Sequence, residues 1–295
     1  MSTSNDAKTE LAPKGIDTLQ NPISYHYCST STFLSIISNK TIWLSDINTM
    51  NDFSERHWAY DRFIEAANLV IGQVGRDFID RIDSVMHHAG YNNLSLVASF
   101  SADGDVLSQW KSYAEDGTGV AVGFDSHQLK NLAVRTVQIE YQKEKQTDHH
   151  RTILLAAHQL FSNLGDNEKK DFIPRFAAKL FYDLSCFKNP AFQEEKELRL
   201  IRVIGVSRKE TDWYLHDGGG NGEKYSRKKL PIKFRAKNGG VVSYIELPLR
   251  SLNENAIKHI VMGPKSVNSG NEISMALTAN GFTGCKITKS EATYR

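Results

Sequence analysis

Cysteine is scarce in this sequence, with 3 residues in 295. Cys28, Cys186 and Cys285 lie far apart and form neither a Cys-x-x-Cys pair nor a Cys/His metal spacing. This argues against both a disulfide framework and a structural zinc site. Apolar stretches long enough to span a bilayer or to form a signal sequence are also lacking. We therefore expect a cytoplasmic protein that does not associate with membranes.

A strong excess of charge is lacking as well, because 36 basic and 34 acidic residues give a formal net charge of +2. Such a chain produces no global field that would attract a polyanion, so a nucleic-acid partner would need a local basic patch. With 40% hydrophobic residues, the chain can bury a sizeable core. The composition is typical of an ordinary globular protein.

Familiar loops for phosphates and metals are missing too. Gly117 and Gly119 resemble a turn into a strand rather than a Walker loop or a Rossmann fingerprint. Four of the ten histidines form the neighbouring pairs His87-His88 and His149-His150, and neighbours do not readily face one metal on a helix or a strand. We expect no metal ion.

The hydrophobic patterns that are present predict an α+β protein. Residues 1–19 are polar and are expected to form a disordered leader, and 20–295 a single domain. Strands are expected at 23–28, 41–44, 94–101, 117–124, 134–141, 240–247, 257–262 and 285–287. Helices are expected at about 30–37, 53–71, 72–88, 106–114 and 271–279.

Two segments are expected to stand apart from this domain. Residues 147–187 hold two helical patterns broken at 163–167, which predicts a helical insertion. Residues 212–230 include a run of glycines and a basic cluster, which predicts a mobile loop. Beside a cleft, a loop of this kind often acts as a lid.

The stretch 189–201 is the most informative, because acidic residues directly precede an alternating apolar run. Alternation predicts a strand with Glu195, Glu197 and Arg199 on one face and Leu198 and Leu200 on the other. Two acids on one cleft wall repel each other, which can raise one pKa and keep a proton available. The alternative is a solvated sheet edge whose charges discourage aggregation.

Two shorter motifs lie on other expected strands. In Tyr25-His26-Tyr27, the tyrosines share one face and His26 takes the other, where it can orient a ligand hydroxyl or amide. Ser99 and Ser101 place two hydroxyls on one face near a strand end, where they can position a sugar or a catalytic acid. The alternatives are a histidine satisfied by the backbone and simple edge polarity.

Aromatic residues offer a further ligand surface. Trp110 and Tyr113 are three apart on one expected helix, so they lie on the same side and, with Trp43, can stack on an aromatic ring. The alternative is that the pair belongs to the core.

A rival hypothesis is a Mg²⁺-dependent nuclease. Asp183, followed after ten residues by Glu194-Glu195-Lys196, matches the acid, then acid-x-lysine, spacing of restriction-like nucleases, in which two acids hold Mg²⁺ and the lysine helps to activate water. The nuclease would be built on Asp183, Glu195 and Lys196. The hypothesis needs Asp183 on a strand, whereas residues 176–187 have a helical pattern.

The motifs in order resemble the bacterial domain-of-unknown-function 2971 family, from about Ile23 to the C-terminus. Each motif is short, so the specificity lies in the ordered set. The motifs are Tyr25-His26-Tyr27, Trp43 to Asp52, Ser99-Phe100-Ser101, Trp110 with Tyr113, Glu194 to Arg199, Val261 to Pro264, and Tyr294-Arg295.

The same order is similar, more loosely, to that of ADP-ribosyltransferases. This resemblance implies a mixed, split sheet that opens around NAD, with His26 in the first-strand role and Ser99 or Ser101 with Tyr113 in the middle role. Glu197 takes the role of the glutamate that favours an oxocarbenium-like transition state, and Glu195 completes a Glu-x-Glu pair. The sequence departs from the pattern in having no first-strand arginine and Ser-Phe-Ser in place of Ser-Thr-Ser.

The resemblance thus implies cleavage of NAD, used as a substrate, and transfer of ADP-ribose to a macromolecular acceptor, either protein or nucleic acid, or hydrolysis. It also implies the context of a toxin or phage-defence effector with an antitoxin or defence-system partner. A nuclease and a recognition module without turnover stay open. The residues expected to act on NAD are Glu197 and Glu195, and those expected to bind it are Tyr25, His26, Tyr27, Ser99, Ser101, Trp110, Tyr113 and Arg199.

Overall fold

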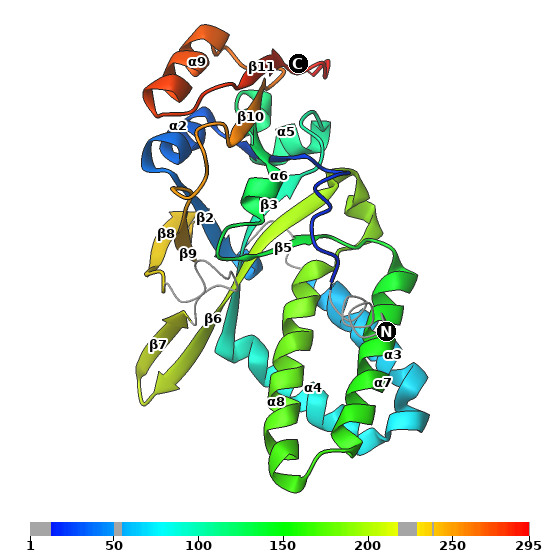
Figure 1. The fold of residues 1–295 in the computed structure, drawn as a ribbon. Helices are drawn as coiled ribbons and strands as arrows, with labels where there is room; N and C mark the ends of the chain where they lie inside the picture. The colour runs from blue at the N-terminus through cyan, green and yellow to red at the C-terminus, as the bar shows by residue number, and fades with distance from the viewer. Residues whose placement is uncertain (1–12, 50–54, 218–228, 238, 295) are drawn as a thin grey trace, which may run out of the picture.

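The computed structural model describes residues 13–49, 55–217, 229–237 and 239–294, and within them the strands form one mixed, unclosed sheet (Figure 1). Its 11 strands follow the order β11-β10-β4-β1-β3-β2-β9-β8, and β6 pairs with β3, β5 and β7. All pairs are antiparallel except β10 with β11. The bounds are β1 (Ile23–Cys28), β2 (Thr41–Asp46), β3 (Asn93–Ser101), β4 (Val120–Asp125), β5 (Arg135–Gln138), β6 (Glu197–Lys209), β7 (Asp212–Asp217), β8 (Ile232–Lys237), β9 (Gly240–Pro248), β10 (Ile257–Met262) and β11 (Lys286–Lys289).

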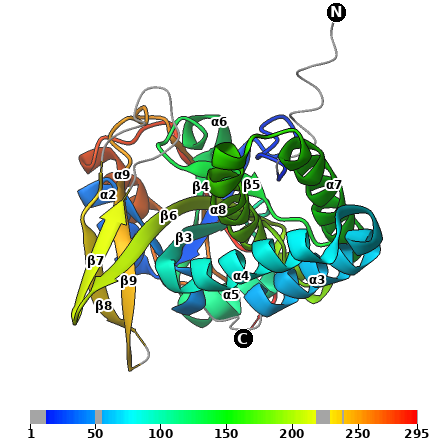
Figure 2. The same cartoon turned by 90° about the horizontal axis from the view of Figure 1, so that it is seen from below.

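Helices lie on both sides of this sheet. They are α2 (Thr30–Asn39), α3 (Glu55–Val74), α4 (Arg76–Asn92), α5 (Leu107–Tyr113), α6 (Ser126–Leu129), α7 (Lys143–Ser162), α8 (Asp166–Asp183) and α9 (Gly270–Ala279). The long helices α3, α4, α7 and α8 run side by side as a bundle, as Figures 1 and 2 show. Within the described residues, no helix combines the length and the apolar character needed to cross a bilayer. The mixed sheet with helices confirms the expected α and β class.

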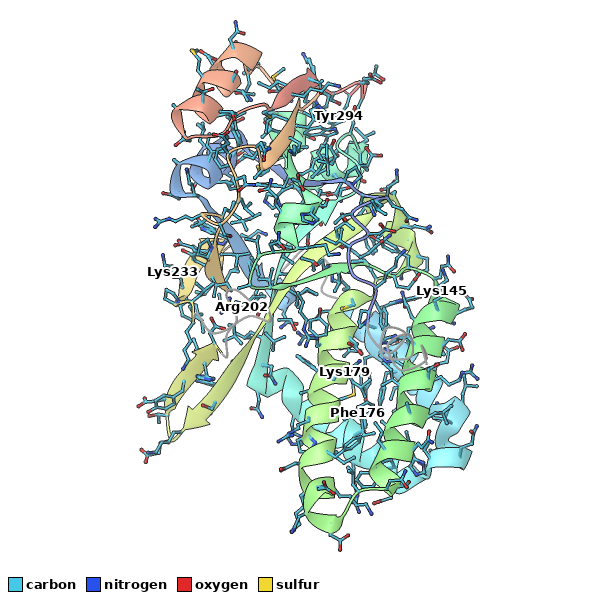
Figure 3. All side chains as sticks on the ribbon, viewed as in Figure 1. Lys145, Phe176, Lys179, Arg202, Lys233 and Tyr294 are labelled. Carbon is cyan, nitrogen blue, oxygen red and sulfur yellow. The ribbon has the colours of Figure 1, made fainter. Side chains whose placement is uncertain are left out.

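Two hydrophobic cores hold the layers together. The first lies between the bundle and the sheet, where Phe63 of α3 and Phe176 of α8 pack in one cluster with Val97 and Ile201 of the sheet (Figure 3). The second lies on the opposite face, where Phe33 of α2 packs in a cluster with Leu198 and Leu200. Successive residues of β3 and β6 therefore face different cores, as the alternation of a strand requires.

The sheet is split along one edge of β3. On its other edge β3 pairs with β6 over its whole length, from Asn93 with Gly205 to Ser101 with Glu197. On the split edge, β2 pairs at Leu96 and Val97, whereas β1 pairs only at Ser101. Residues 98–100 consequently lie where β1 and β2 diverge, and no ladder partner occupies that edge in the described residues.

Three segments differ from the expectations of domain organisation. The helices expected as an insertion at 147–187 begin earlier, at Lys143, and α8 ends at Asp183. They share the first core with α3 and α4, because their apolar faces need a partner, so they are an integral half of the bundle. In the leader expected at 1–19, Ile16 is buried in the second core, while residues 1–12 lie outside the described residues.

The loop expected at 212–230 begins instead as the strand β7. It pairs with β6 from Asp212 opposite Lys209 to Asp217 opposite Ile204. Asp217 ends the strand with a buried ion pair to Arg202, 2.7 Å between carboxylate and guanidinium, and this pair fixes the end of the strand. Residues 218–228 of the expected loop lie outside the described residues.

A pair of glycine substitutions tests the packing of β4 against β1. A Cβ on Gly119 would lie 2.2 Å from the carbonyl oxygen of Cys28, so we expect Gly119→Ala to destabilise the protein by about 1–3 kcal/mol. Gly72 is exposed within α3 and has open space around it, so Gly72→Ala should stabilise by about 0.5–1 kcal/mol. Urea unfolding measures both changes, and shifts of the same sign would contradict the packing described.

Candidate functional site

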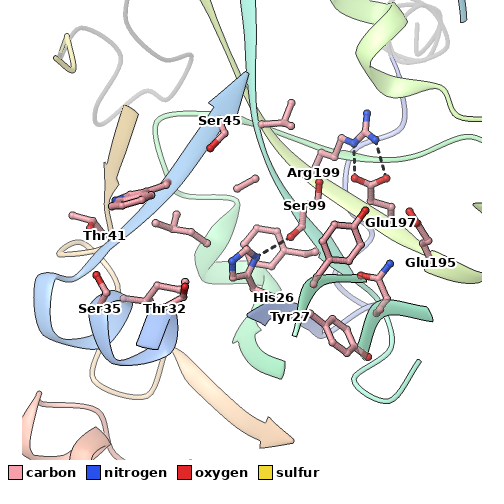
Figure 4. A pocket seen from close by; sticks show the side chains of 18 of the residues that line it. His26, Tyr27, Thr32, Ser35, Thr41, Ser45, Ser99, Glu195, Glu197 and Arg199 are labelled. Carbon is pink, nitrogen blue, oxygen red and sulfur yellow. Dashed lines mark hydrogen bonds and ion pairs between the residues drawn. The ribbon is translucent and has the colours of Figure 1, made fainter. Parts of the chain in front are cut away.

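A cavity of about 370 Å³ lies at the split of the sheet (Figure 4). Its walls come from β1, α2, β2, the start of α3, β3, α5, residues 188–195, β6 and β8, so strands on both sides of the split contribute. Alternation places His26 and Phe100 toward the second core, and Ser99, Glu197 and Arg199 toward the first. The cavity thus reaches both faces of the sheet, and its size lies within the roughly 300–1,000 Å³ of ligand pockets.

The local sequence decides how the two expected glutamates enter the cavity. The Asn189 side chain accepts a bond from the Ala191 amide, and Pro190 follows it, so residues 190–195 form the 3₁₀ helix η4 (Pro190–Glu195). Lys196 then adopts a left-handed backbone with φ 46°. Because this residue breaks the alternation, the placement of Glu195 on the strand was wrong. Its side chain nevertheless lines the cavity.

Arg199 and Glu197 share one face of β6 and form a two-pronged ion pair. The Nε and Nη2 atoms of Arg199 donate to the two carboxylate oxygens of Glu197 at 2.6 and 2.8 Å. Nη1 of Arg199 also donates to the carboxylate of Glu55 at the start of α3 and, at 2.8 Å, to the carbonyl of Ser185. One guanidinium therefore joins β6, the bundle and the segment after α8.

Lys188 completes this cluster, which we call the acidic network: Glu55, Lys188, Glu195, Glu197 and Arg199. Nζ of Lys188 lies 2.6 Å from Glu195, 3.1 Å from Glu197 and 3.8 Å from Glu55. All five side chains are at most 12% exposed. Three carboxylates and two cations leave a formal excess of one negative charge at this end of the cavity.

The two glutamates that flank Lys196 have pKa values shifted in opposite directions. Burial raises the pKa of Glu195, and the charge of Glu197 adds to the shift against the pull of Lys188. Burial alone would also raise the pKa of Glu197. Arg199, Lys188 and the Ser99 hydroxyl outweigh this effect and hold that pKa well below the usual range. Repulsion between acids therefore contributes, as expected, although burial is the larger cause. At neutral pH Glu197 is a fixed anion.

His26 lines the cavity from β1. Its Nδ1 lies 2.9 Å from the carbonyl oxygen of Ser99, on the edge of β3 left open by the split. A carbonyl only accepts, so Nδ1 carries the proton and Nε2 is an acceptor. Burial lowers the pKa of His26, against the effect of its bond to Ser99, so the ring is neutral at neutral pH. His26 offers a ligand a hydrogen-bond acceptor.

Two tyrosines border the acidic network. Tyr113, the last residue of α5, lines the cavity, and burial together with the charge of Glu195 raises its pKa to about 12. Its hydroxyl is therefore a donor at neutral pH. The hydroxyl of Tyr141 accepts a bond from the backbone N–H of Glu197 at 3.0 Å, which fixes the start of β6.

The other expected site residues support the cavity or lie apart from it. The Tyr25 hydroxyl bonds to Nδ1 of His259 at 3.0 Å, away from the lining. Tyr27 lines the cavity, but its hydroxyl donates to the carbonyl of Asp103 and accepts from the backbone N–H of Val106, just before α5. Ser101 donates to the carbonyl of Glu195 at 2.7 Å and so positions η4.

The proposed aromatic trio is not assembled. Trp110 is fully buried in a small core with Tyr27 and bonds through Nε1 to Asp105. Trp43 lines the cavity beside Tyr244 of β9, at 4.5 Å between ring centroids. The reason is that Trp110 packs against Tyr27 of β1, so Tyr113 is the aromatic residue of α5 that lines the cavity.

Residues that sequence reasoning missed include Glu55, Lys188 and Tyr141. They come from three distant segments, and each meets Glu197 or Arg199 only through the fold. The local sequence around them carries no motif. The one available signal is that Lys188 and Arg199 lie near a run of glutamates, and buried cations need acidic partners.

The nuclease set does not come together. Asp183 ends α8, where it pairs with Lys179 at 2.6 Å and with His149 at 3.2 Å. Lys196 is exposed and pairs with Asp103 at 2.9 Å. Neither Asp183 nor Lys196 lines the cavity that Glu195 faces. In the part of the chain that is described, no three His, Cys, Asp or Glu side chains are grouped as metal ligands.

The acidic network makes a prediction about stability. Arg199→Met leaves two buried carboxylates without their main cation, so we expect a loss of about 3–5 kcal/mol in the free energy of unfolding at neutral pH. Lys196→Met removes an exposed cation of the same segment and should cost at most about 1 kcal/mol. Urea unfolding compares the two, and equal losses would contradict the importance of the buried pair.

The pH dependence of this loss follows from the low pKa of Glu197 in the folded protein. A carboxyl whose pKa is lowered on folding stabilises above its ordinary pKa, about 4.3, and this contribution is lost as the pH falls through the folded value. The difference between wild type and Arg199→Met should therefore shrink below about pH 4. A difference that is constant with pH would mean that charge is not its origin.

Comparison with known proteins adds one match. Residues 109–200 match a family model described as "Protein of unknown function (DUF2971)". The matched segment runs from α5 into β6, so it carries Tyr113, Lys188, Glu195, Glu197 and Arg199 of the site. No curated protein and no solved structure matches the chain. The match supports the resemblance to the DUF2971 family, whose description assigns no function.

Proposed function

We propose that this protein cleaves the nicotinamide glycosidic bond of NAD and transfers ADP-ribose to a macromolecular acceptor. The observation that carries the proposal is the meeting of His26, Ser99 and Glu197 in one cavity. They come from β1, β3 and β6, which are neighbours at the split of the sheet. The order of these motifs is what the resemblance to ADP-ribosyltransferases requires.

The charge of the site suits the first half of this reaction. When the bond between ribose C1′ and the nicotinamide nitrogen breaks, its electron pair leaves with nicotinamide and positive charge develops on the ribose. The acidic network has one excess negative charge, and Glu197 is a fixed, nearly buried anion. A preorganised anion in a site sheltered from water stabilises such a transition state far more than an exposed one.

The second half requires a base. The acceptor's oxygen or nitrogen forms the new bond to C1′ and loses a proton. Glu195 is suited to take this proton because burial raises its pKa, which makes it a better base than an ordinary glutamate. Neutral His26 accepts a hydrogen bond from the ribose or the carboxamide through Nε2, and Tyr113 donates one. These groups orient the substrate.

The role of Glu197 is tested by incubating the purified protein with NAD and following nicotinamide release by chromatography. Glu197→Gln keeps the shape and removes the charge, so we expect release to fall by about 10²–10³-fold. Release by the wild type should persist in EDTA, since no step uses a metal ion. Thermal melting of the variant verifies that it is folded.

A matched control comes from Asp183→Asn, which alters a buried carboxylate outside the cavity and should leave release largely intact. Loss of activity in EDTA and in Asp183→Asn, with DNA or RNA cleaved, would establish the nuclease instead. NAD binding without release, unchanged in Glu197→Gln, would establish a recognition module.

The pH profile tests Glu195 separately. With Glu195 as the base, the rate of transfer should rise with pH as this carboxyl ionises, through a pKa above that of an ordinary glutamate. Glu195→Gln should abolish this rise. It should also slow the hydrolysis of NAD by water less than it slows the transfer of ADP-ribose to the acceptor. A rise that survives in Glu195→Gln would assign it to another group.

A further inference from the structure

Of the described residues that line the cavity away from the acidic network, Arg235 of β8 is the one cation. Its guanidinium lies over the ring of Trp43 at 4.9 Å and near that of Tyr244 at 5.8 Å. Nη2 donates to the hydroxyl of Ser45 at 3.1 Å. Two rings and one hydroxyl thus hold the guanidinium in a fixed orientation in the wall of the cavity.

This cation has no counter-charge among the residues that the structure describes. No carboxylate of theirs lies within ion-pair distance of Arg235, and its buried Nε has no hydrogen-bond partner among them. Burial accordingly lowers the pKa of Arg235, with only the weak opposing effect of Tyr244. The contrast with Lys188 and Arg199 is sharp, because each of those contacts carboxylates at 3.1 Å or less.

Hydroxyl groups line this side of the cavity (Figure 4), and that of Ser45 lies next to Arg235. Ser45 and Thr41 share a face of β2, and α2 contributes Thr32 and Ser35 to the lining. A hydroxyl donates to an anion without needing a counter-charge of its own. A stacked guanidinium that lacks a counter-charge among the described residues and lies beside the Ser45 hydroxyl matches the oxygens of a phosphate group.

We propose that Arg235, with Ser45, forms a subsite for the phosphate group of a nucleotide. The subsite has Trp43 and Tyr244 behind the guanidinium and the split of the sheet between it and the acidic network. It rests on the proposed function for the choice of NAD as the full ligand. The subsite itself requires only a phosphate ester or pyrophosphate and no reaction.

The subsite also fixes the direction in which a ligand lies. The acidic network repels phosphate and favours positive charge, whereas Arg235 does the opposite. A ligand with a cationic ring at one end and a pyrophosphate beyond the first ribose, as in NAD, is therefore oriented with its glycosidic bond toward Glu197. The reversed orientation places an anion beside an excess of carboxylate charge, which is unfavourable.

Calorimetric binding of AMP, ADP-ribose and adenosine to the full chain tests this subsite. We expect the wild type to bind the two phosphorylated ligands more tightly than adenosine. Arg235→Gln should weaken AMP and ADP-ribose by roughly 10- to 100-fold and leave adenosine unchanged. Arg235→Lys should recover only part of the loss, because a point charge lacks the planar fork.

Lys233→Gln is the matched control, since it removes a cation from the same strand (Figure 3). Lys233 pairs with Glu246 and does not line the cavity. It should bind all three ligands as the wild type does. Equal weakening by both variants, loss of adenosine binding in Arg235→Gln, or failure of the wild type to bind the phosphorylated ligands would overturn the subsite. Phosphate-dependent binding without nicotinamide release would instead leave the subsite standing and reject the glycosidic reaction.

Discussion

The rest of the site depends on the buried contact between Arg199 and Glu197. Through one guanidinium, β6 is joined to the start of α3 and to the backbone after α8, segments far apart in the chain. Burying these charges costs several kcal/mol for each ion, and the cost is offset only when geometry and hydrogen bonds are good, as they are here. A hydrophobic cluster of the same size would stabilise the junction at least as well. The retention of charge at a cavity wall is therefore better explained by what the cavity does than by stability.

The split of the sheet explains why the cavity lies where it does. A strand edge in a sheet interior normally finds a ladder partner, because an unpaired buried backbone group is costly. At residues 98–100 the diverging strands leave that edge open, and His26 satisfies the carbonyl of Ser99 in place of a neighbouring strand. This hydrogen bond also fixes the tautomer of His26, because Nδ1 must carry the proton and Nε2 is then an acceptor. The contact between His26 and Ser99 therefore both completes the open strand edge and leaves a hydrogen-bond acceptor in the cavity.

The sequence predicted the parts of the structure that local patterns determine. Alternation identified Glu197 and Arg199 on one face of a strand, and helical periodicity identified the bundle helices, because both reflect burial on one side. It failed for Glu195, where a single left-handed residue, Lys196, interrupts the strand. It also failed for Trp110, because tertiary packing places this ring against Tyr27 in a small core and not in the cavity. The positions of Glu55, Lys188 and Arg235 in the site could not be predicted from local patterns, since the fold brings the first two to opposite charges and the third to the rings of Trp43 and Tyr244.

The position of the cavity across the sheet has a mechanical consequence. The bundle core and the opposite core share strands but are otherwise separate clusters, so each can loosen with some independence. A ligand that touches residues facing both cores links them, because neither half can open without giving up part of the bound contacts. Occupancy would then act as a clamp that turns two partly independent units into one cooperative unit. In a cell, the lifetime of the folded protein against proteolysis would then follow the concentration of the ligand that fills the cavity.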